Sequence, residues 1–485
     1  MVPLEGIKVL GVPVGSAQWA SARCEDVVRE LEESLPLLAD IPDMQTQLLL
    51  LGFCAHPRFI HMLRGVCPAV LQEAALRHDT AIQASLQGIA GAVLPLPDIV
   101  VSLSQLPRRW GGGGLTSAQR LSPAGYLGSW ALVWAQMSLL FPHLAELLPH
   151  LGAPEGTAVG DLPTARQLQQ CADTLARNRV DAGAVDESLL PKGASPTVSL
   201  AFAGFVSSRE RLQKEFSTIA HAADFARLYA DAPTNAAKAR ILSVSSQGAQ
   251  AHWQAIPAFY QFVVPHDAGV AALSLQLGLP QPSLRGVRTC ICGANIDPLG
   301  YHYLTCDHRG FTISRHHGLR DTVCEMLKTV YDPASVHKEP IHHHSYSPLH
   351  KPDVVVRNFD GRGNFLVVDT SVAFPCAPTY VDNAARTRLY AAKLHEAAKI
   401  GAYGNMGSNE LVPFAVETFG ALGPAARALL SRCSRIRRNR LGPEAAESTW
   451  SARSFTSYWS QRLAVCLQVD LGRGICARAA DDYVP

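Results

Sequence analysis

The pattern of apolar and polar residues separates a helical amino-terminal part from a mixed carboxyl-terminal part. An alternating segment that ends in glycine and proline predicts a strand and turn over residues 7–15. Apolar residues then recur every three or four positions, which predicts helices over 24–38, 43–54, 69–87, 123–140, 207–239, 246–256 and 265–282. Residues 153–194 have weak periodicity and several glycines and prolines, a composition that predicts a linker.

From about residue 283 onward the pattern is mixed. Apolar periodicity predicts a helix over 317–330, and two apolar runs at 353–356 and 365–369 flank a glycine-containing turn at 360–364. A longer helical pattern over 381–400 and a helical tail follow. These elements predict an α+β protein, in which a mainly α-helical amino-terminal region precedes an α/β domain with a helical tail.

Composition excludes several classes of protein. The 485 residues are 47% hydrophobic and only 17% charged, which excludes global disorder. The net charge of +2 gives no general cationic field, so a nucleic-acid-binding surface has to be local. We find no apolar run of the ~20 residues that a membrane span needs, and no pattern of a secretory signal. The sequence therefore predicts a nuclear or cytoplasmic protein with reduced cysteines, neither secreted nor bound to a membrane.

Three cysteines and a histidine have the spacing C-x-C-x9-H-x3-C. They are Cys290, Cys292, His302 and Cys306. Three thiolates and an imidazole are the ligands of a closed, tetrahedral structural zinc site, which leaves no position for a reactive water. The C-x-C gap is tighter than usual, so His308 or His316 could replace one ligand. Unrelated buried thiols are the alternative interpretation.

Two aspartates lie at corresponding ends of the two predicted strands. Asp353 begins the first strand and Asp369 ends the second, so a hairpin can bring them close together. A carboxylate among Val and Leu residues costs free energy unless it is paired or binds a metal ion. Two such carboxylates, with a substrate phosphate, can hold a catalytic Mg²⁺.

Phosphodiester hydrolysis at such a site also calls for a lysine near the attacking water. The position two after Asp369 is Ser371, so the candidates lie on the next predicted helix, at Lys393 and Lys399. At 100° per residue, Lys399 falls on the apolar stripe that begins at Val381 and points toward the sheet. Lys393 points toward the edge of the sheet.

Three more acids and a histidine tract lie nearby in the sequence. A third acid at the metal site could be Asp321, Glu325 or Glu339, although each alone is more typical of a solvated charge. His342–His344 resembles a metal-binding tract, but its Ser- and Pro-containing surroundings predict a surface loop.

A run of arginines near the carboxyl terminus predicts a local cationic surface. Within fourteen residues that contain no acid, the run holds Arg427, Arg432, Arg435, Arg437, Arg438 and Arg440. Such a run is typical of a phosphate-binding surface, and a solvated helix end is the alternative.

Several motifs together resemble the carboxyl-terminal part of non-LTR retrotransposon reverse transcriptase polyproteins that carry a restriction-like endonuclease. The resemblance rests on the Cys/His cluster followed in order by Arg315-His316, Leu319-Arg320-Asp321, Glu339-Pro340, Lys351-Pro352-Asp353, Asp369-x-Ser371-Val372 and residues 412–420. Residues 6–13 resemble the strand and turn that close a polymerase palm, and residues 115–130 resemble the region behind its thumb. The resemblance spans nearly the whole chain, and its carboxyl-terminal motifs are the specific part.

The resemblance implies five regions. They are the end of a palm with a thumb-like helical region (1–152), a linker and helical region (153–282), a zinc knuckle (283–316), a PD-(D/E)xK endonuclease domain (317–425) and a basic helical tail (426–485). It also implies that the Cys/His cluster binds zinc, that Asp353 and Asp369 hold Mg²⁺, and that Lys399 is a displaced catalytic lysine.

The activity implied is nicking of target DNA, with element RNA as a second candidate partner. No Tyr/Phe-x-Asp-Asp motif occurs in the sequence, so polymerase activity is not expected. A non-enzymatic nucleic-acid-binding remnant that keeps the zinc module is the alternative, and a helical scaffold protein is the third hypothesis.

Overall fold

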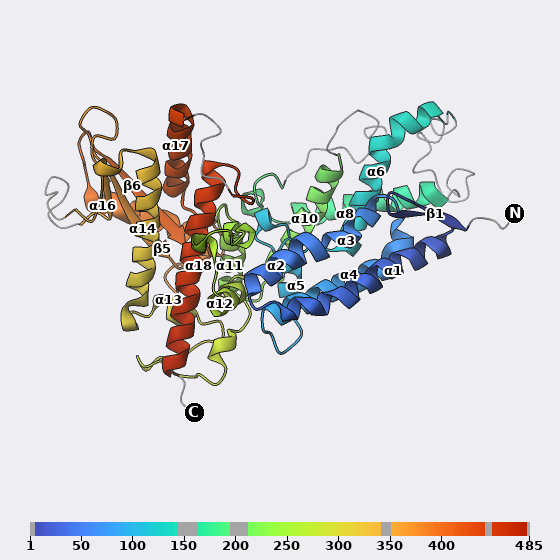
Figure 1. Ribbon diagram of the computed structural model, residues 1–485, viewed down its shortest axis with the longest axis horizontal. Helices are drawn as coiled ribbons and strands as arrows, with labels where there is room; N and C mark the ends of the chain where they lie inside the picture. The colour runs from blue at the N-terminus through green and yellow to red at the C-terminus, as the bar shows by residue number, and fades with distance from the viewer. Residues whose placement is uncertain are drawn as a thin grey trace.

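The computed structural model describes residues 5–140, 142, 163–194, 212–340, 351–441 and 449–482. Helices make up most of an elongated body, which has the amino terminus at one end and a sheet flanked by helices at the other (Figure 1). The long helix α18 (Phe455–Asp482) stands across the body, between the sheet end and the amino-terminal helices. The predicted α+β class is confirmed.

The amino-terminal part is a β-hairpin followed by packed helices. Strand β1 (Gly6–Val9) pairs with β2 (Val12–Gly15) around Leu10 and Gly11, whose φ angles of 50° and 84° are typical of a two-residue hairpin turn. The predicted helices over 24–38, 43–54, 69–87, 123–140 and 265–282 are present with different ends. The helices of this part are α1 (Ala17–Ser34), α2 (Met44–Leu50), α3 (Pro57–Ile60), α4 (Pro68–Ile89), α5 (Asp98–Gln105), α6 (Ala118–Leu140), α8 (Pro163–Gly183), α10 (Leu212–Ala230), α11 (Asn235–Val244) and α12 (His266–Leu277).

Three predictions for this part are wrong. The predicted linker contains helix α8, because Leu168 and Leu175 belong to an apolar stripe that packs into a core with α6 and α10. The predicted helix over 207–239 is interrupted before Pro233, and Thr234 caps the separate helix α11. Residues 246–256 form turns because Gly248 has a φ of 98°, which ends any helix. Residues 153–162 and 207–211 lie outside the described part of the chain.

The carboxyl-terminal part contains a four-stranded mixed sheet. Strands β3 and β4 are antiparallel, as are β4 and β5, whereas β5 and β6 are parallel. The β4–β5 pair is the hairpin that the sequence predicts around residues 360–364. The strands, in spatial order, are β3 (Val336–Lys338), β4 (Val354–Val356), β5 (Leu366–Ala373) and β6 (Glu410–Glu417).

Helices cover both faces of the sheet. Val354 points into the main core, which also contains side chains of α14 (Phe311–Val330) and α17 (Pro424–Leu441). Val355 points to the opposite face and packs in a second cluster with the end of α16 (Tyr390–Tyr403). Since side chains alternate along a strand, odd-numbered residues of β4 face α16.

The predicted helix over 381–400 is two helices. The short α15 (Val381–Ala384) ends well before α16, and Leu389, with a φ of 59°, precedes the first residue of α16. A helical phase counted from Val381 is therefore wrong. Within α16 itself, Lys399 follows Glu396 by three residues and precedes Tyr403 by four, so these three share one face.

Helix α18 is a central part of the core. Leu463, Leu467, Leu471 and Ile475 recur at helical spacing and lie in the apolar core that joins the amino-terminal helices to the sheet. The helix packs against α12 and α14. In the predicted basic tail, the run of arginines lies on α17, whereas α18 carries as many aspartates as arginines.

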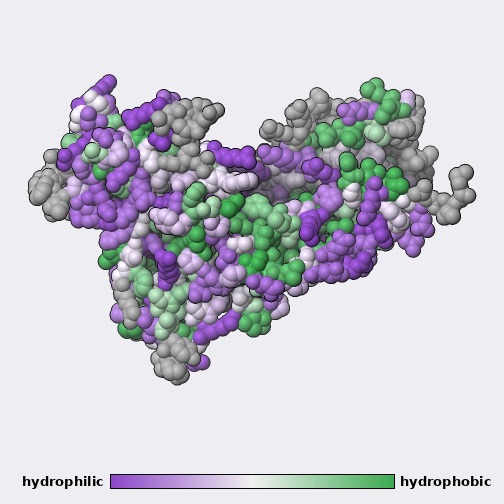
Figure 2. Space-filling model, in the orientation of Figure 1, coloured by the Kyte–Doolittle hydropathy of each residue, from purple (hydrophilic) through white to green (hydrophobic). Residues whose placement is uncertain are grey.

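The hydropathy of the surface differs between the centre of the molecule and the end that carries the sheet. Figure 2 shows hydrophobic side chains gathered near the centre of the view and mainly hydrophilic side chains over the end that carries the sheet. Within the described ranges, no helix has both the length and the apolar content to cross a bilayer. The candidate residues of the acid pair lie at the hydrophilic end, on the sheet.

Candidate functional site

The four residues of the predicted zinc cluster come together. The ligand atoms of Cys290, Cys292, His302 and Cys306 all lie within 4.8 Å of one another. Cys292 Sγ and His302 Nε2 are 3.3 Å apart. Three thiols and an imidazole at these distances suit a tetrahedral Zn²⁺, whose bonds to sulfur and nitrogen are about 2.0–2.3 Å long. The cluster can therefore hold one zinc ion.

Short turns position these ligands. Gly293 has a φ of 86°, and its amide donates to the Cys290 carbonyl (2.7 Å), which closes the C-x-C turn. The short helix α13 (Tyr301–Thr305) carries His302. The Asp297 carboxylate accepts a hydrogen bond from the His302 amide (2.9 Å), so the start of this helix is fixed close to the cysteines.

The last turn of α18 attaches the cluster to the rest of the protein. The Asp482 carboxylate accepts hydrogen bonds from the Ile291 amide (3.0 Å) and from the Tyr303 hydroxyl (2.6 Å). Arg478 donates to the carbonyl of Tyr303 and to that of Cys306 (2.7 Å). Both halves of the cluster are thus bound to one helix end.

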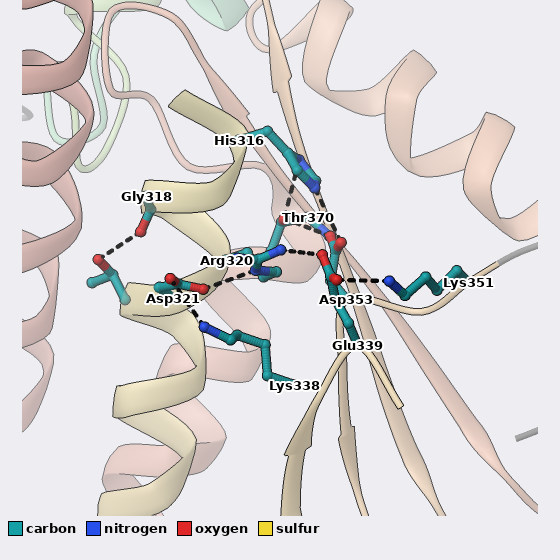
Figure 3. Close-up of polar contacts among 10 residues, drawn as sticks. His316, Gly318, Arg320, Asp321, Lys338, Glu339, Lys351, Asp353 and Thr370 are labelled. Carbon is teal, nitrogen blue, oxygen red and sulfur yellow. Dashed lines mark hydrogen bonds and ion pairs between the residues drawn. The ribbon is translucent and has the colours of Figure 1, made fainter. Parts of the chain in front are cut away.

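Neither alternative ligand belongs to the cluster in the described residues. The group contains the four predicted members and does not include His308 or His316. His316 lies on α14, and its side chain points toward the sheet, to Asp353 (Figure 3). Neither histidine therefore replaces one of the four predicted ligands in the cluster.

Asp353 and Asp369 lie opposite each other where the pairing of β4 with β5 ends. Val354 pairs with Val368, and extending this register by one residue places Asp353 across from Asp369. Extending the β3–β4 register in the same way places Glu339 across from Asp353, and the Glu339 amide donates to the Asp353 carbonyl (2.8 Å). Three acids therefore lie in a row across three adjacent strands.

Asp353 is buried and held by hydrogen bonds. Its Oδ2 accepts from both the amide and the hydroxyl of Thr370 (2.6 Å each), and its Oδ1 lies 3.0 Å from His316 Nε2 (Figure 3). Burial alone would raise the pKa of Asp353, but the hydrogen bonds from His316 and Thr370 outweigh it and hold the pKa below its usual value. Asp353 is therefore an anion at neutral pH.

Asp369 has a lysine as its partner. Lys399 Nζ donates to Asp369 Oδ1 (2.9 Å), with side chains that are 34% and 7% exposed. Burial raises the pKa of Asp369 above its usual value, the charge of Asp353 adds to this effect, and Lys399 offsets it only in part. Lys393 is exposed at the start of α16. Of the two candidate lysines, Lys399 is the one that reaches the acid pair.

Two of the three candidates for a third acid belong to a separate ion-pair network. Arg320, on α14, donates to Asp321 (2.8 Å) and to Glu339 (Figure 3). Lys338 donates to Asp321 (3.3 Å), and Lys351 donates to Glu339 (2.7 Å). Both carboxylates are therefore neutralised by side chains of the protein.

The remaining candidate points away from the sheet. Glu325 pairs with Arg462 of α18 (2.5 Å). In the described ranges, no third acid or histidine joins Asp353 and Asp369 in a group with metal-ligand spacing. The tract His342–His344 lies outside the described residues.

The arginine run lies on α17, and part of it is engaged in the fold. Arg432 donates to both carboxylate oxygens of Glu410 (2.6 and 2.7 Å), and Arg440 donates to a backbone carbonyl at the end of α14. Arg437 is partly buried. Arg435 and Arg438 are exposed, and they are the members best placed to contact a polyanion.

The sequence pattern does not reveal the partners of Asp353. Thr370 follows Asp369 directly, but nothing in its spacing shows that its amide and hydroxyl both reach Asp353. His316 is separated from Asp353 by 37 positions, and only the packing of α14 on the sheet brings the two together. Neither a protein-family model nor a curated protein matches this chain. The function is therefore argued from the residues and their geometry.

Proposed function

We propose that this chain is the carboxyl-terminal part of a non-LTR retrotransposon polyprotein and that it acts as a metal-dependent DNA endonuclease. The observation that carries the proposal is the contact of Lys399 with Asp369, directly across the sheet from Asp353. Under this proposal, residues 283–316 form a structural zinc knuckle and residues 317–425 form a PD-(D/E)xK domain. DNA is the substrate, element RNA is a further partner, and the site of action is the nucleus or the cytoplasm.

The acid pair suits a hard dication. Mg²⁺ in proteins is usually bound through one or two carboxylates and keeps several water ligands. Asp353 and Asp369 are both buried, and each anion disfavours the other, so a cation between them would relieve the repulsion. Mg²⁺ held by these two oxygen donors would polarise the scissile phosphate and acidify a bound water.

Protein side chains complete the site. Thr370 and His316 hold Asp353 in one orientation through three contacts to its two oxygens. Lys399 is one-third exposed, so its ammonium can donate to a phosphate oxygen while it remains close to Asp369. A fixed positive charge at this position stabilises the negative charge that develops during phosphodiester hydrolysis.

Nicking of supercoiled plasmid DNA tests the proposed activity. We expect the purified protein to convert supercoiled circles to nicked circles when Mg²⁺ or Mn²⁺ is added, and not without a divalent cation. A well-folded preparation that leaves the plasmid intact with both cations would contradict the proposal.

Lys399→Ala should lower the nicking rate by roughly a hundredfold, because it removes the positive charge beside the acid pair. The rate is measured under single-turnover conditions with saturating DNA. Lys328→Ala is the matched control, since Lys328 is an exposed lysine at the end of α14, away from the acid pair. Equal rates for the two variants would remove Lys399 from the mechanism.

A second candidate function is nucleic-acid binding without cleavage. The observation that favours it is that Thr370, His316 and Lys399 already satisfy both aspartates with hydrogen bonds and an ion pair. The acid pair can therefore serve to hold α14 and α16 on the sheet. Metal-dependent nicking distinguishes the two functions, because only the endonuclease performs it.

The exposed arginines of α17 give a test that both candidate functions share. Replacing Arg435 and Arg438 with Ala should lower the slope of log affinity for duplex DNA against log salt by about 2, because each lost phosphate contact removes ~0.9. Arg432→Ala should instead lower stability, since it leaves Glu410 without its partner. An unchanged slope in the double variant would assign the run to solubility alone.

A further inference from the structure

A cavity of about 590 Å³ collects a large excess of positive charge. Among the described residues that line it, six are cations and none is acidic. The whole chain has a net charge of only +2, so this cavity holds a concentrated local field. The six cations are Arg108, Arg109, Lys192, Arg388, Lys393 and Arg427.

The cations come from four segments that are far apart in the sequence. Two belong to the 3₁₀ turn Arg108–Trp110, which follows α5, and Lys192 lies in the loop that follows the 3₁₀ turn Glu187–Leu189. Arg388 and Lys393 flank the start of α16, and Arg427 lies in the first turn of α17. The fold, rather than any run in the sequence, assembles the charge.

The positive charge of the cavity is only partly neutralised. None of the six cations forms an ion pair with a described residue. Arg388 donates to the Leu189 carbonyl (2.5 Å) and the Ser245 hydroxyl (2.9 Å), both of them uncharged. Burial lowers the pKa of Arg388 to about 10, so it stays protonated at neutral pH. Two buried carboxylates act on these cations without pairing with them. Glu417, whose pKa is raised to about 7 by burial, acts on Arg388 and Lys393, and Glu396, whose pKa burial also raises, acts on Arg427 and Lys393.

The amino-terminal ends of α16 and α17 do not bind an anion in this cavity, because carboxylates of the protein already accept hydrogen bonds from their amides. Glu396 accepts a hydrogen bond from the Ala425 amide at the start of α17 (3.0 Å). Glu417 lies 3.4 Å from the Ala392 amide, which donates to it near the start of α16. These carboxylates occupy the amino-terminal ends of both helices, so an anion in the cavity has to be bound by the arginine and lysine side chains.

We propose that this cavity binds the phosphodiester backbone of a single-stranded nucleic acid. Arginine and lysine side chains that form no ion pair with a described residue are donors that phosphates prefer. The other polar lining residues are serines and glutamines, and no described lining residue is aromatic, so the contacts are made to phosphates and not by stacking on bases. The volume is that of a small-ligand pocket, which admits a short stretch of one strand but not a duplex.

The position of the cavity connects it to the acid pair. Lys393 lines the cavity and Lys399 contacts Asp369, and the two lysines are six residues apart on α16. Six residues of helix span about 9 Å along its axis. The cavity and the acid pair therefore lie within about two turns of each other along α16, with Lys393 and Lys399 on different faces of the helix. The binding itself needs neither a divalent cation nor cleavage, so it does not rest on the proposed nuclease activity.

The test uses the three exposed cations of the cavity, because Arg388 also anchors the backbone. We compare the full chain with the triple variant Arg109→Ala, Lys192→Ala and Lys393→Ala. The probe is a fluorescent single-stranded DNA of about 20 nucleotides, and its anisotropy is followed across a salt series without divalent cation. We expect the slope of log affinity against log salt to fall by about 2, since each single-strand phosphate contact contributes ~0.7.

A matched triple variant removes the same charge elsewhere. Lys8, Arg64 and Lys214 are exposed cations outside the cavity, and replacing them with Ala should leave the slope within about 0.5 of the wild-type value. Equal losses in the two triple variants would overturn the proposal, because binding would then follow net charge alone. The milder pair Lys192→Gln and Lys393→Gln, with a thermal unfolding curve for each variant, separates lost binding from lost folding.

A further measurement tests whether the bound ligand is a nucleic-acid backbone or a free phosphate compound. Inorganic tripolyphosphate at the same phosphate concentration should displace the oligonucleotide poorly, because it spans fewer cations. Complete displacement would overturn the assignment to a nucleic-acid backbone. The binding assay contains no divalent cation, so cleavage makes no contribution to the affinity that it measures. A missing nuclease activity therefore leaves this result unaffected, and a missing salt effect leaves the nuclease proposal standing.

Discussion

Asp369→Asn should abolish metal-dependent nicking while the protein keeps its fold. The change removes one of the two negative charges proposed to hold the catalytic cation, and we expect a loss of at least roughly 10²–10³-fold in rate. The fold should survive, because the amide is as large as the carboxylate and the neighbouring strand residues remain buried among apolar side chains. Losing the ion pair with Lys399 costs about 1 kcal/mol or less, since that lysine is one-third exposed.

Asp353→Asn should have the same effect on nicking for the same reason. Its amide oxygen can still accept the two hydrogen bonds from Thr370, and its new amide group can donate to the ring nitrogen of His316. The strand ends therefore stay in place. Supercoiled-plasmid nicking gives the rate for both variants, and thermal unfolding reports whether the fold is retained.

Asp360→Asn is the matched control for these two variants. Asp360 is an exposed aspartate in the turn between β4 and β5, so it lies on the same hairpin but away from the pair. It should nick at the wild-type rate. If Asp353→Asn or Asp369→Asn were as active as Asp360→Asn, the proposed metal site would be wrong, and the acid pair would be a structural element of the sheet.

The parts of the site that could be predicted are those whose residues lie close to one another in the sequence. The zinc ligands lie within one short segment, where spacing nearly determines which side chains can meet. Asp353 and Asp369 belong to adjacent strands of one hairpin, so the alternation of side chains and a single turn fix their relation. Local geometry is readable in the sequence because few other conformations satisfy the same spacing.

The orientation of Lys399 agrees with its prediction, but the argument behind that prediction does not hold. The phase was counted from Val381, and the break before α16 makes that count meaningless. Lys399 faces the sheet because it shares a face of α16 with Tyr403, which packs against β4 and β5. Apolar periodicity alone does not show where one helix ends and the next begins when no proline marks the break.

The cationic cavity and the partners of the acid pair could not be predicted. Arg388 lies about 280 positions after Arg108, and no local pattern connects them. His316 meets Asp353 only because α14 packs across the sheet. The helix α8 was missed for a different reason, since its flanking glycines and prolines outweighed the apolar stripe that includes Leu168. Long-range packing decides each of these cases.

Removal of one zinc ligand should release the metal and loosen a defined part of the protein. Cys306→Ser leaves two thiolates and one imidazole, and a serine hydroxyl does not ionise at neutral pH to replace the lost thiolate. Binding of a structural zinc ion contributes directly to folding, so the segment that depends on it should become disordered. Elemental analysis should find about one zinc per wild-type chain and well under one in the variant.

The contacts of the zinc cluster determine which residues should become disordered when the zinc ion is lost. Asp482 and Arg478 bind the cluster to the last turn of α18, so amide hydrogen exchange should accelerate over residues 290–306 and 478–482. The sheet should keep its protection, because its strands are paired with one another and pack against α14, α16 and α17. Cys54→Ser is the matched control, since Cys54 is exposed and outside the cluster, and it should change neither zinc content nor exchange. Wild-type protein with well under one equivalent of zinc, or a Cys306→Ser variant that retains a full equivalent, would show that the cluster is a set of unrelated thiols.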